Sequence, residues 1–166
     1  MITLNISGID AVMQRLESID MDMLCFDIAS SLKAKVKHRV HVEGKASDGS
    51  QIGTYSESYM KVRTNNFKSK AIVRGKNKGN PRTVYKRGAD TKIILSLTRQ
   101  MEKDFDATKP IPITNGYGIG YSNSHNYEKA RWNEERYGKQ IFAPSDSEKA
   151  LAKEIVSNYV AKINND

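Results

Sequence analysis

Apolar residues recur every four positions between Met21 and His41. The stripe consists of Leu24, Ile28, Leu32, Val36 and Val40. This spacing places side chains on one face of an α-helix, so we predict one long amphipathic helix from Met21 to about His41. Lysines and Arg39 occupy its last turns, where positive charge complements the helix dipole, and Gly44 ends it. Ahead of it, residues 2–6 alternate as in a short strand or the lead-in to a helix, and Asp10 caps a first, shorter helix.

The last part of the chain carries a second stripe with the same period. It consists of Leu151, Ile155, Tyr159 and Ile163. Ser145 is followed three residues later by Glu148, which is the pattern of a capping box, so this helix is predicted to begin after Ser145. Another helix is predicted from Asn123 or Ser124 to Tyr137, with Gly138 closing it.

Between these helices the pattern predicts a small antiparallel sheet. Residues 111–114 and 117–121 are predicted to form a β-hairpin with Asn115-Gly116 at the bend. Residues 93–97 are predicted to begin a strand or a helix, which runs into a helical turn through residues 101–105.

Three glycines alternate along the second predicted strand, namely Gly116, Gly118 and Gly120. Alternate residues of a strand point to the same side. A phosphate-binding loop needs its glycines at a strand-to-helix turn, and these glycines lie inside a strand. We therefore interpret them as a surface on which a helix packs closely against the sheet.

Charge divides the chain into a body and a basic segment. Residues 61–92 contain eleven Lys or Arg and one acid, Asp90, which gives a net charge of +10. The whole chain carries 27 basic and 19 acidic residues, so the rest holds 16 basic and 18 acidic groups and is nearly neutral. The length suits a single domain, residues 1–166, with one core.

The basic segment cannot form a core of its own, because glycines and a proline are spaced along it and large apolar residues are few. We predict that residues 61–92 form an extended β-arm, called the basic arm, which neighbouring subunits or nucleic acid hold in place. A solvated charged loop is the alternative. The contacts to a partner or to DNA are assigned to Lys68, Lys70, Arg74, Lys76, Lys78, Arg82, Lys86 and Arg87.

Other features limit the protein's environment. Cys25 is the only cysteine, which excludes an intramolecular disulfide and fits a reducing compartment. No stretch approaches the roughly 20 apolar residues of a membrane span, and the amino terminus lacks the pattern of a secretory signal. We expect neither a membrane protein nor a secreted precursor. Glu134-Glu135 stands beside two arginines, which suits a solvated face or an ion-pair patch between subunits.

Candidate groups for chemistry are few. His38, His41 and Glu43 lie close together at a helix end, but no fourth metal ligand accompanies them. Asp104 and Asp106 have the generic spacing of a nuclease carboxylate pair, without a partner acid on an adjacent strand. We expect no catalytic residue, no cofactor and no bound metal.

Two stretches carry motifs. The first is GKASDGSQIGTYSESYMKVR, residues 44–63; the second begins with LTRQMEKDF at Leu97 and ends with GYGIGYSNSHNYEKARWNEERYGKQIFAPSDSE at Glu148. Both resemble the virion morphogenesis family of tailed bacteriophages, which comprises tail-completion and neck proteins. Arg99 stands where that family has a glycine, and the basic arm is longer and more basic than is usual there. The structural positions of the motifs are Gly49, Gly53, Tyr55, Tyr59, Trp132, Glu134, Tyr137 and Gly138.

The resemblance implies a non-enzymatic structural protein of the virion, made in the host cytoplasm. Its implied fold is α+β, with a long N-terminal helix and C-terminal helices packed on a small antiparallel sheet. It further implies a homo-oligomeric ring at the head–tail junction, around the DNA channel and in contact with connector or portal-side proteins and tail proteins. A ring needs a heterologous interface that closes on itself, and an arm that becomes ordered on contact suits such an interface.

Two other functions stay open. The chain is alternatively a free nucleic-acid-binding protein that uses residues 61–92 as an electrostatic clamp. Ring formation at salt concentrations that weaken phosphate binding separates the structural protein from the clamp. A phage-encoded nuclease is the third and weakest hypothesis, and metal-dependent DNA cleavage that Asp104→Ala abolishes would support it.

Overall fold

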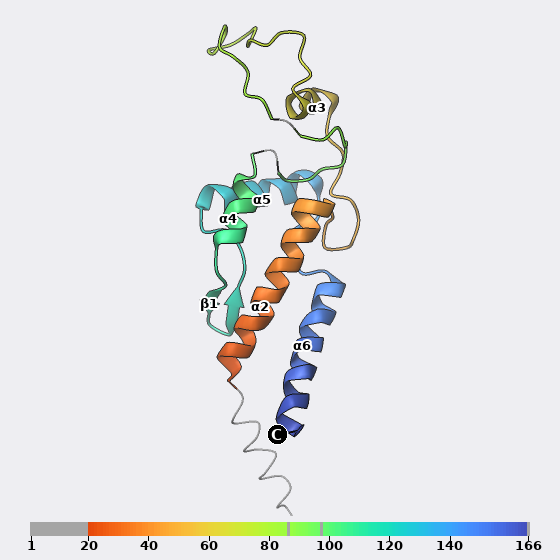
Figure 1. Cartoon of the computed structure of the whole chain (residues 1–166), viewed down its shortest axis with the longest axis vertical. Helices are drawn as coiled ribbons and strands as arrows, with labels where there is room; N and C mark the ends of the chain where they lie inside the picture. The colour runs from red at the N-terminus through yellow and green to blue at the C-terminus, as the bar shows by residue number, and fades with distance from the viewer. Residues whose placement is uncertain (1–19, 86, 97, 166) are drawn as a thin grey trace, which may run out of the picture.

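The computed structural model describes residues 20–85, 87–96 and 98–165 (Figure 1). The predicted strand at residues 2–6 and the predicted first helix up to residue 19 lie outside the described residues. The elements in chain order are α2 (Met21–His38), the π-helical turn η1 (Arg39–Glu43), α3 (Glu57–Thr64), α4 (Gln100–Ala107), β1 (Ile111–Ile113), β2 (Gly116–Gly118), α5 (Ser124–Tyr137) and α6 (Asp146–Asn165). The fold is α+β, with a long helix near the amino end and one antiparallel two-stranded sheet, as the sequence predicts.

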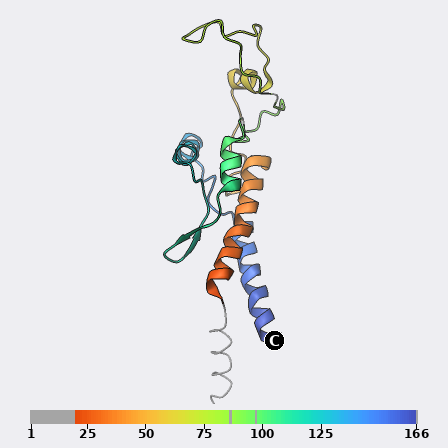
Figure 2. The same ribbon diagram turned by 60° about the vertical axis from the view of Figure 1, so that its left-hand side comes forward.

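The long helix is the axis of the body. α2 packs along α6 on one side, while the hairpin, α4 and α5 lie on the other side (Figure 2). Asp20 caps its start by accepting a hydrogen bond from the Met23 backbone N–H at 2.9 Å. The helix passes into the π-turn and ends at Gly44, which has a φ of 67°. A Cβ on Gly44 would lie 2.2 Å from the Ile93 carbonyl oxygen, so only glycine fits this crossing.

The core lies at the carboxyl end of α2, where segments distant in sequence meet. Its fully packed members are Val36, Val40, Ala46, Ile52, Ile93, Phe105 and Ile141. Tyr121 and Phe142 extend this core as a row of aromatic rings, because Tyr121 lies 5.3 Å from Phe105 and 5.6 Å from Phe142 between ring centroids. The turn after η1, the segment around Ile93 and the link before α6 all contribute to the same cluster.

One buried ion pair joins η1, at the end of α2, to α6. The Arg39 guanidinium donates to both carboxylate oxygens of Glu148, at 2.9 and 3.2 Å. It also donates to the carbonyl oxygens of Lys45, Ile141 and Ala143 at 2.9 to 3.1 Å. Arg39 is 8% exposed and Glu148 is 4% exposed. The sequence suggested only a dipole contact for Arg39, whereas its side chain ties four segments together.

The predicted capping box at the start of α6 is confirmed. The Ser145 backbone N–H donates to Glu148 Oε2 at 2.7 Å, and the Glu148 N–H donates to Ser145 Oγ at 3.3 Å. Burial alone would raise the pKa of Glu148, but the hydrogen bonds from Arg39 and Ser145 outweigh it and hold this pKa below its usual value. Glu148 is therefore a buried carboxylate that stays charged and paired.

The hairpin forms where it was predicted, with a different turn. Its register pairs Ile113 with Gly116, so the two turn residues are Thr114 and Asn115 rather than Asn115 and Gly116. Gly116, the first residue of β2, has a φ of 138°, a conformation that glycine adopts readily because it has no Cβ. The strands are also shorter than predicted and end at Ile113 and Gly118.

The close helix packing predicted for the glycines of this strand is wrong. A Cβ built on Gly116 or Gly120 would have no neighbour within 4 Å, and one on Gly118 would meet only Ile113 and Ile111 of the partner strand. The residue that meets α2 is instead Tyr117, whose ring packs on Phe26 and whose hydroxyl donates to the Asp22 carboxylate.

Two more expectations need correction. Residues 57–64 form the helix α3, so the first residues of the basic arm are helical rather than extended. Residues 93–96 form neither a strand nor a helix; Ile93 is buried in the core, and Thr54 pairs with Lys92 in an isolated bridge. Both segments take their shape from tertiary contacts, since neither has a long apolar pattern of its own.

Replacing Arg39 with Ala is expected to destabilise the protein by about 3–5 kcal/mol, because Glu148 would remain buried without its partner. Arg39→Lys should recover only part of this loss, since an ammonium cannot reach the same five acceptors. Chemical denaturation measures both. Replacement of the exposed Lys35 of α2 by Ala is the matched control, expected within about 0.5 kcal/mol of the unaltered protein. A loss below about 1 kcal/mol for Arg39→Ala would show that the pair does not hold α6.

Candidate functional site

The basic arm leaves the body through α3 and returns to it at Lys92 (Figure 1). Asn65 ends α3 in the left-handed conformation, with a φ of 55°. Beyond it, the arm closes on itself once, through an isolated bridge between Ala71 and Pro81 and two backbone hydrogen bonds between Ile72 and the 79–80 segment. The predicted β-arm is therefore a loop with a single bridge rather than a ladder of strands.

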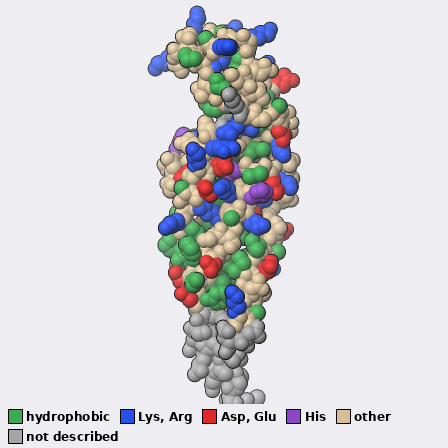
Figure 3. Space-filling model, in the orientation of Figure 1, with side chains coloured by type: hydrophobic (Ala, Val, Ile, Leu, Met, Phe, Trp, Pro, Cys, Tyr) green, Lys and Arg blue, Asp and Glu red, His purple; other side chains and the backbone are tan. Residues whose placement is uncertain are grey.

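Most of the predicted contact residues of the arm are exposed. Five of them, Lys68, Lys70, Arg74, Lys76 and Lys78, make no side-chain hydrogen bond or ion pair with the described residues. In Figure 3 the Lys and Arg side chains of the arm project outward at the top of the view. This geometry suits contact with an external anion, because the charges are solvated and unopposed.

The other three predicted arm residues differ from these five. The Arg82 guanidinium lies over the Phe67 ring at 4.0 Å, and its Nε donates to the Ser69 carbonyl oxygen at 3.2 Å, so Arg82 shapes the loop. Arg87 is partly buried, and its backbone N–H donates to the Arg63 carbonyl oxygen. Lys86 lies outside the described residues.

A tyrosine and an arginine anchor the base of the arm. The Tyr55 hydroxyl accepts a hydrogen bond from the Ile94 N–H at 3.0 Å and donates to the Ile94 carbonyl oxygen. Arg63, only 4% exposed, lies over the Tyr55 ring at 4.6 Å and donates to its hydroxyl at 3.3 Å. Burial raises the pKa of Tyr55, so this hydroxyl stays protonated and can donate. Arg63 was predicted as part of the charged arm, whereas it is a buried anchor.

Most other motif residues also have structural contacts. Tyr59 stacks near Tyr55 at 4.7 Å between centroids. A Cβ on Gly53 would lie 3.1 Å from Ile93 and 3.4 Å from Tyr137, which explains the glycine. Gly49 and Gly138 have φ values of 80° and 60°, in a turn and at the end of α5 respectively.

Glu134 and Trp132 lie on α5 but differ in burial. The Glu134 carboxylate accepts hydrogen bonds from the backbone N–H groups of Ile141 and Phe142, at 2.7 and 3.0 Å. The surface role predicted for Glu134 is therefore wrong. Trp132 is 56% exposed and has a single ring contact, edge-on to His125 at 6.5 Å. The fold alone gives no packing role to this tryptophan.

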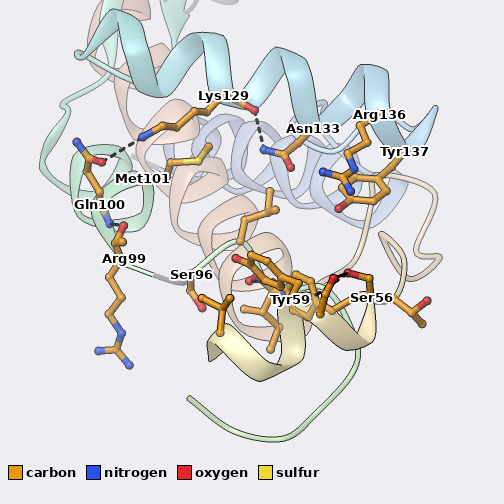
Figure 4. Close-up of a pocket in the computed structure, with 17 residues that line it drawn as sticks. Ser56, Tyr59, Ser96, Arg99, Gln100, Met101, Lys129, Asn133, Arg136 and Tyr137 are labelled. Carbon is orange, nitrogen blue, oxygen red and sulfur yellow. Dashed lines mark hydrogen bonds between the residues drawn. The ribbon is translucent and has the colours of Figure 1, made fainter. Parts of the chain in front are cut away.

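A pocket of about 780 Å³ lies between α3, α5 and the segment before α4 (Figure 4). It is called the arm-base pocket. Its polar and charged lining includes Tyr59, Arg99, Gln100, Lys129, Asn133 and Arg136. Lys129 Nζ donates to Gln100 Oε1 at 3.1 Å across one end of the pocket. Sequence reasoning missed this pocket, because its walls come from three segments that only the fold brings together.

The candidate metal ligands do not come together. His38 Nε2 lies 3.3 Å from Glu43 Oε1 at the surface, whereas His41 points into the core. Throughout the described ranges, no three His, Cys, Asp or Glu side chains gather closely enough to hold a metal ion. The carboxylates of Asp104 and Asp106 have different partners. Asp104 accepts hydrogen bonds from Ser122 and Asn126, and Asp106 pairs with Lys37 at 2.7 Å.

Comparison of the chain with protein-family models, with curated proteins and with solved structures finds no match. The resemblance to tail-completion proteins therefore rests on the short motifs of this chain alone. None of the helices in residues 20–85, 87–96 and 98–165 has an apolar stretch long enough to cross a membrane.

His41 is expected to make stability depend on pH. Burial lowers the pKa of this histidine, its Nδ1–H donates to the Leu95 carbonyl oxygen at 3.1 Å, and Nε2 has no partner among the described residues. The unfolded chain, with a histidine pKa of about 6.5, then binds the proton more readily than the folded one. Stability should be complete above about pH 6.5 and should fall as the pH drops below it.

Chemical denaturation at pH 7.5 and 5.5 measures this effect. His41→Gln should reduce the loss of stability between these two conditions, and replacement of the exposed His125 by Gln controls for removal of a histidine elsewhere. An unchanged pH dependence in His41→Gln would contradict the assignment.

Arg99 has the backbone conformation of a glycine. Its φ is 57° and its ψ is 11°, directly before α4. A side chain in this region costs about 1 kcal/mol. Arg99→Gly should therefore be about 1 kcal/mol more stable than Arg99→Ala, which removes the same side-chain contacts but keeps the strain. Thermal or chemical unfolding compares the two, and equal stabilities would mean that the backbone relaxes at this position.

Proposed function

We propose that this chain is a structural protein of a tailed-phage virion, a tail-completion or neck component that forms a homo-oligomeric ring around the DNA channel at the head–tail junction. The observation that carries the proposal is the joining of its two motif stretches. The Tyr55 hydroxyl of the first stretch is hydrogen-bonded to Ile94, which lies three residues before the second stretch. Gly53 of the first stretch packs against Tyr137 of the second. Residues that resemble one family thus act as one structural unit.

The backbone at Arg99 supports the same proposal. The family that the motifs resemble has a glycine at this position, and the chain keeps a φ of 57° there despite its arginine. A positive φ at a non-glycine residue is uncommon and indicates that the surrounding turn dictates the conformation. The turn before α4 therefore keeps the geometry that a glycine motif would have.

The exposed cations of the arm favour a second candidate, a free nucleic-acid-binding protein that uses the arm as a clamp. Five unopposed positive side chains on one loop suit a phosphate backbone, whatever its sequence. In the proposed ring the same loop lies against a neighbouring subunit or against the DNA in the channel. The two functions differ in whether the protein assembles without nucleic acid.

The test is the mass of the purified full chain in nucleic-acid-free buffer at high salt. A ring should persist where phosphate binding has weakened, since interfaces between subunits also bury apolar surface. Glutamine at Lys68, Lys70, Arg74, Lys76 and Lys78 should weaken duplex binding and leave ring formation intact. The matched control places glutamine at five exposed lysines of the body, Lys103, Lys109, Lys149, Lys153 and Lys162. A chain that stays monomeric and binds short duplexes with a steep salt dependence would instead be the clamp.

A further inference from the structure

The arm-base pocket carries one sign of charge. Arg99, Lys129 and Arg136 line it, and none of its described lining residues is acidic. Arg99 Nε lies 3.8 Å from Glu102, whereas Arg136 forms no ion pair with the described residues, and its guanidinium lies 5.6 Å from the centroid of the Tyr137 ring. In Figure 4, Lys129, Asn133 and Arg136 line the α5 side of the pocket and Tyr59 lies across from them. Such a pocket favours an occupant with negative charge.

An exposed tryptophan extends this surface. Trp132 lies three residues after Lys129 and four before Arg136 on α5, so the three side chains share one side of the helix. Trp132 is 56% exposed and lies beside the pocket rather than among its lining residues, whose apolar side chains include Val62 and Met101. Tryptophan, tyrosine and arginine around a pocket are the residues that dominate protein–protein interfaces. The occupant should therefore combine apolar side chains with carboxylates.

The start of α2 has this chemistry. Residues 20–27 read DMDMLCFD, with three acids, and no Lys or Arg occurs between Arg15 and Lys33. Met21 and Met23 are 58% and 56% exposed, and Phe26 is 38% exposed. Asp27 is exposed and makes no hydrogen bond or ion pair with the described residues. Of the three acids, Asp20 caps α2 and Asp22 accepts from the Tyr117 hydroxyl, so Asp27 is the one without a partner among the described residues. The negative charge of this end is complementary to the positive charge of the arm-base pocket.

The two surfaces lie at opposite ends of the described part of the chain. In Figures 1 and 2 the start of α2 lies at the far end of the body from α3 and α5, which carry residues of the pocket lining. A chain so arranged cannot fill its own pocket. We propose that the start of α2 (residues 20–27) of one copy docks in the arm-base pocket of a second copy. This inference rests on the proposed ring, in which each copy contributes one end and one pocket to a heterologous contact.

Occupation of the pocket would also fix the arm. The pocket lies between α3 and the body, and α3 is joined to the body through Tyr55 and Arg63. An occupant that contacts Tyr59 on one side and α5 on the other bridges the two. Assembly then holds the basic arm in one orientation relative to the body.

Two variants of the full chain test the contact. A pocket variant carries Lys129→Glu and Arg136→Glu; an end variant carries Met23→Arg and Asp27→Arg. Each alone should weaken self-association by about tenfold or more, because like charges then face each other. An equimolar mixture should recover association, because the intact end of the pocket variant fits the intact pocket of the end variant, and the reversed end and reversed pocket are again opposite in charge. Analytical ultracentrifugation or mass photometry gives these masses, and circular dichroism checks that each variant is folded.

Matched charge reversals on α6 serve as controls. Lys153→Glu with Lys162→Glu, and Glu154→Arg with Val160→Arg, change exposed residues of α6 and should assemble like the unaltered protein. If both test variants assemble normally while the unaltered chain forms rings, the contact is wrong and the proposed function stands. If only the pocket variant fails, the occupant is not the α2 start. An unaltered chain that stops at a dimer sensitive to both variants supports the contact and overturns the ring, and a monomer at every concentration overturns both.

Discussion

A single buried guanidinium fixes the end of the body on which the arm is built. Arg39 holds the carboxylate of Glu148 and three backbone carbonyl groups, so the π-turn, the turn after it, the link before α6 and α6 itself share one side chain. A buried ion pair adds little net stability over an apolar pair, but its loss leaves a charge buried without a partner. The pair thus specifies how the segments meet, because other arrangements of the same helices would leave one charge buried without a partner.

The position of the arm follows from this arrangement. The turn after η1 leads to Gly53, which packs on Tyr137, and to Tyr55, whose hydroxyl is hydrogen-bonded to Ile94. Helix α3 begins directly afterwards. The base of the arm is therefore tied to the core, while the loop beyond Asn65 has one bridge and one stacked pair, Arg82 on Phe67. Stability falls along this path from the core to the loop, because each step buries less apolar surface and leaves more backbone in solvent.

Local signals in the sequence predicted the long elements well. α2, α5 and α6 each have an apolar stripe or a cap that acts over a few residues, and the Ser145 and Glu148 box formed as predicted. α3 was missed because its eight residues include few apolar ones and its cap, Ser56, is a common residue. The position of Arg39 in the sequence also indicates burial, since it lies on the same side of the predicted helix as Val36 and Val40. The arm-base pocket had no such signal, because Arg99, Lys129 and Arg136 come together only in the fold.

The distribution of acids decides what can order the arm. Many carboxylates of the body already have partners: Asp104 caps the segment before α5, Asp106 pairs with Lys37, Glu134 binds two backbone N–H groups and Glu148 holds Arg39. Transferring any of them to the arm would cost the body a contact. In the proposed function, the anions that neutralise the arm loop come from outside this chain, from nucleic acid or from the surface of another protein. In that proposal, contacts with a partner hold the arm in place, whereas the near-neutral body has a core of its own.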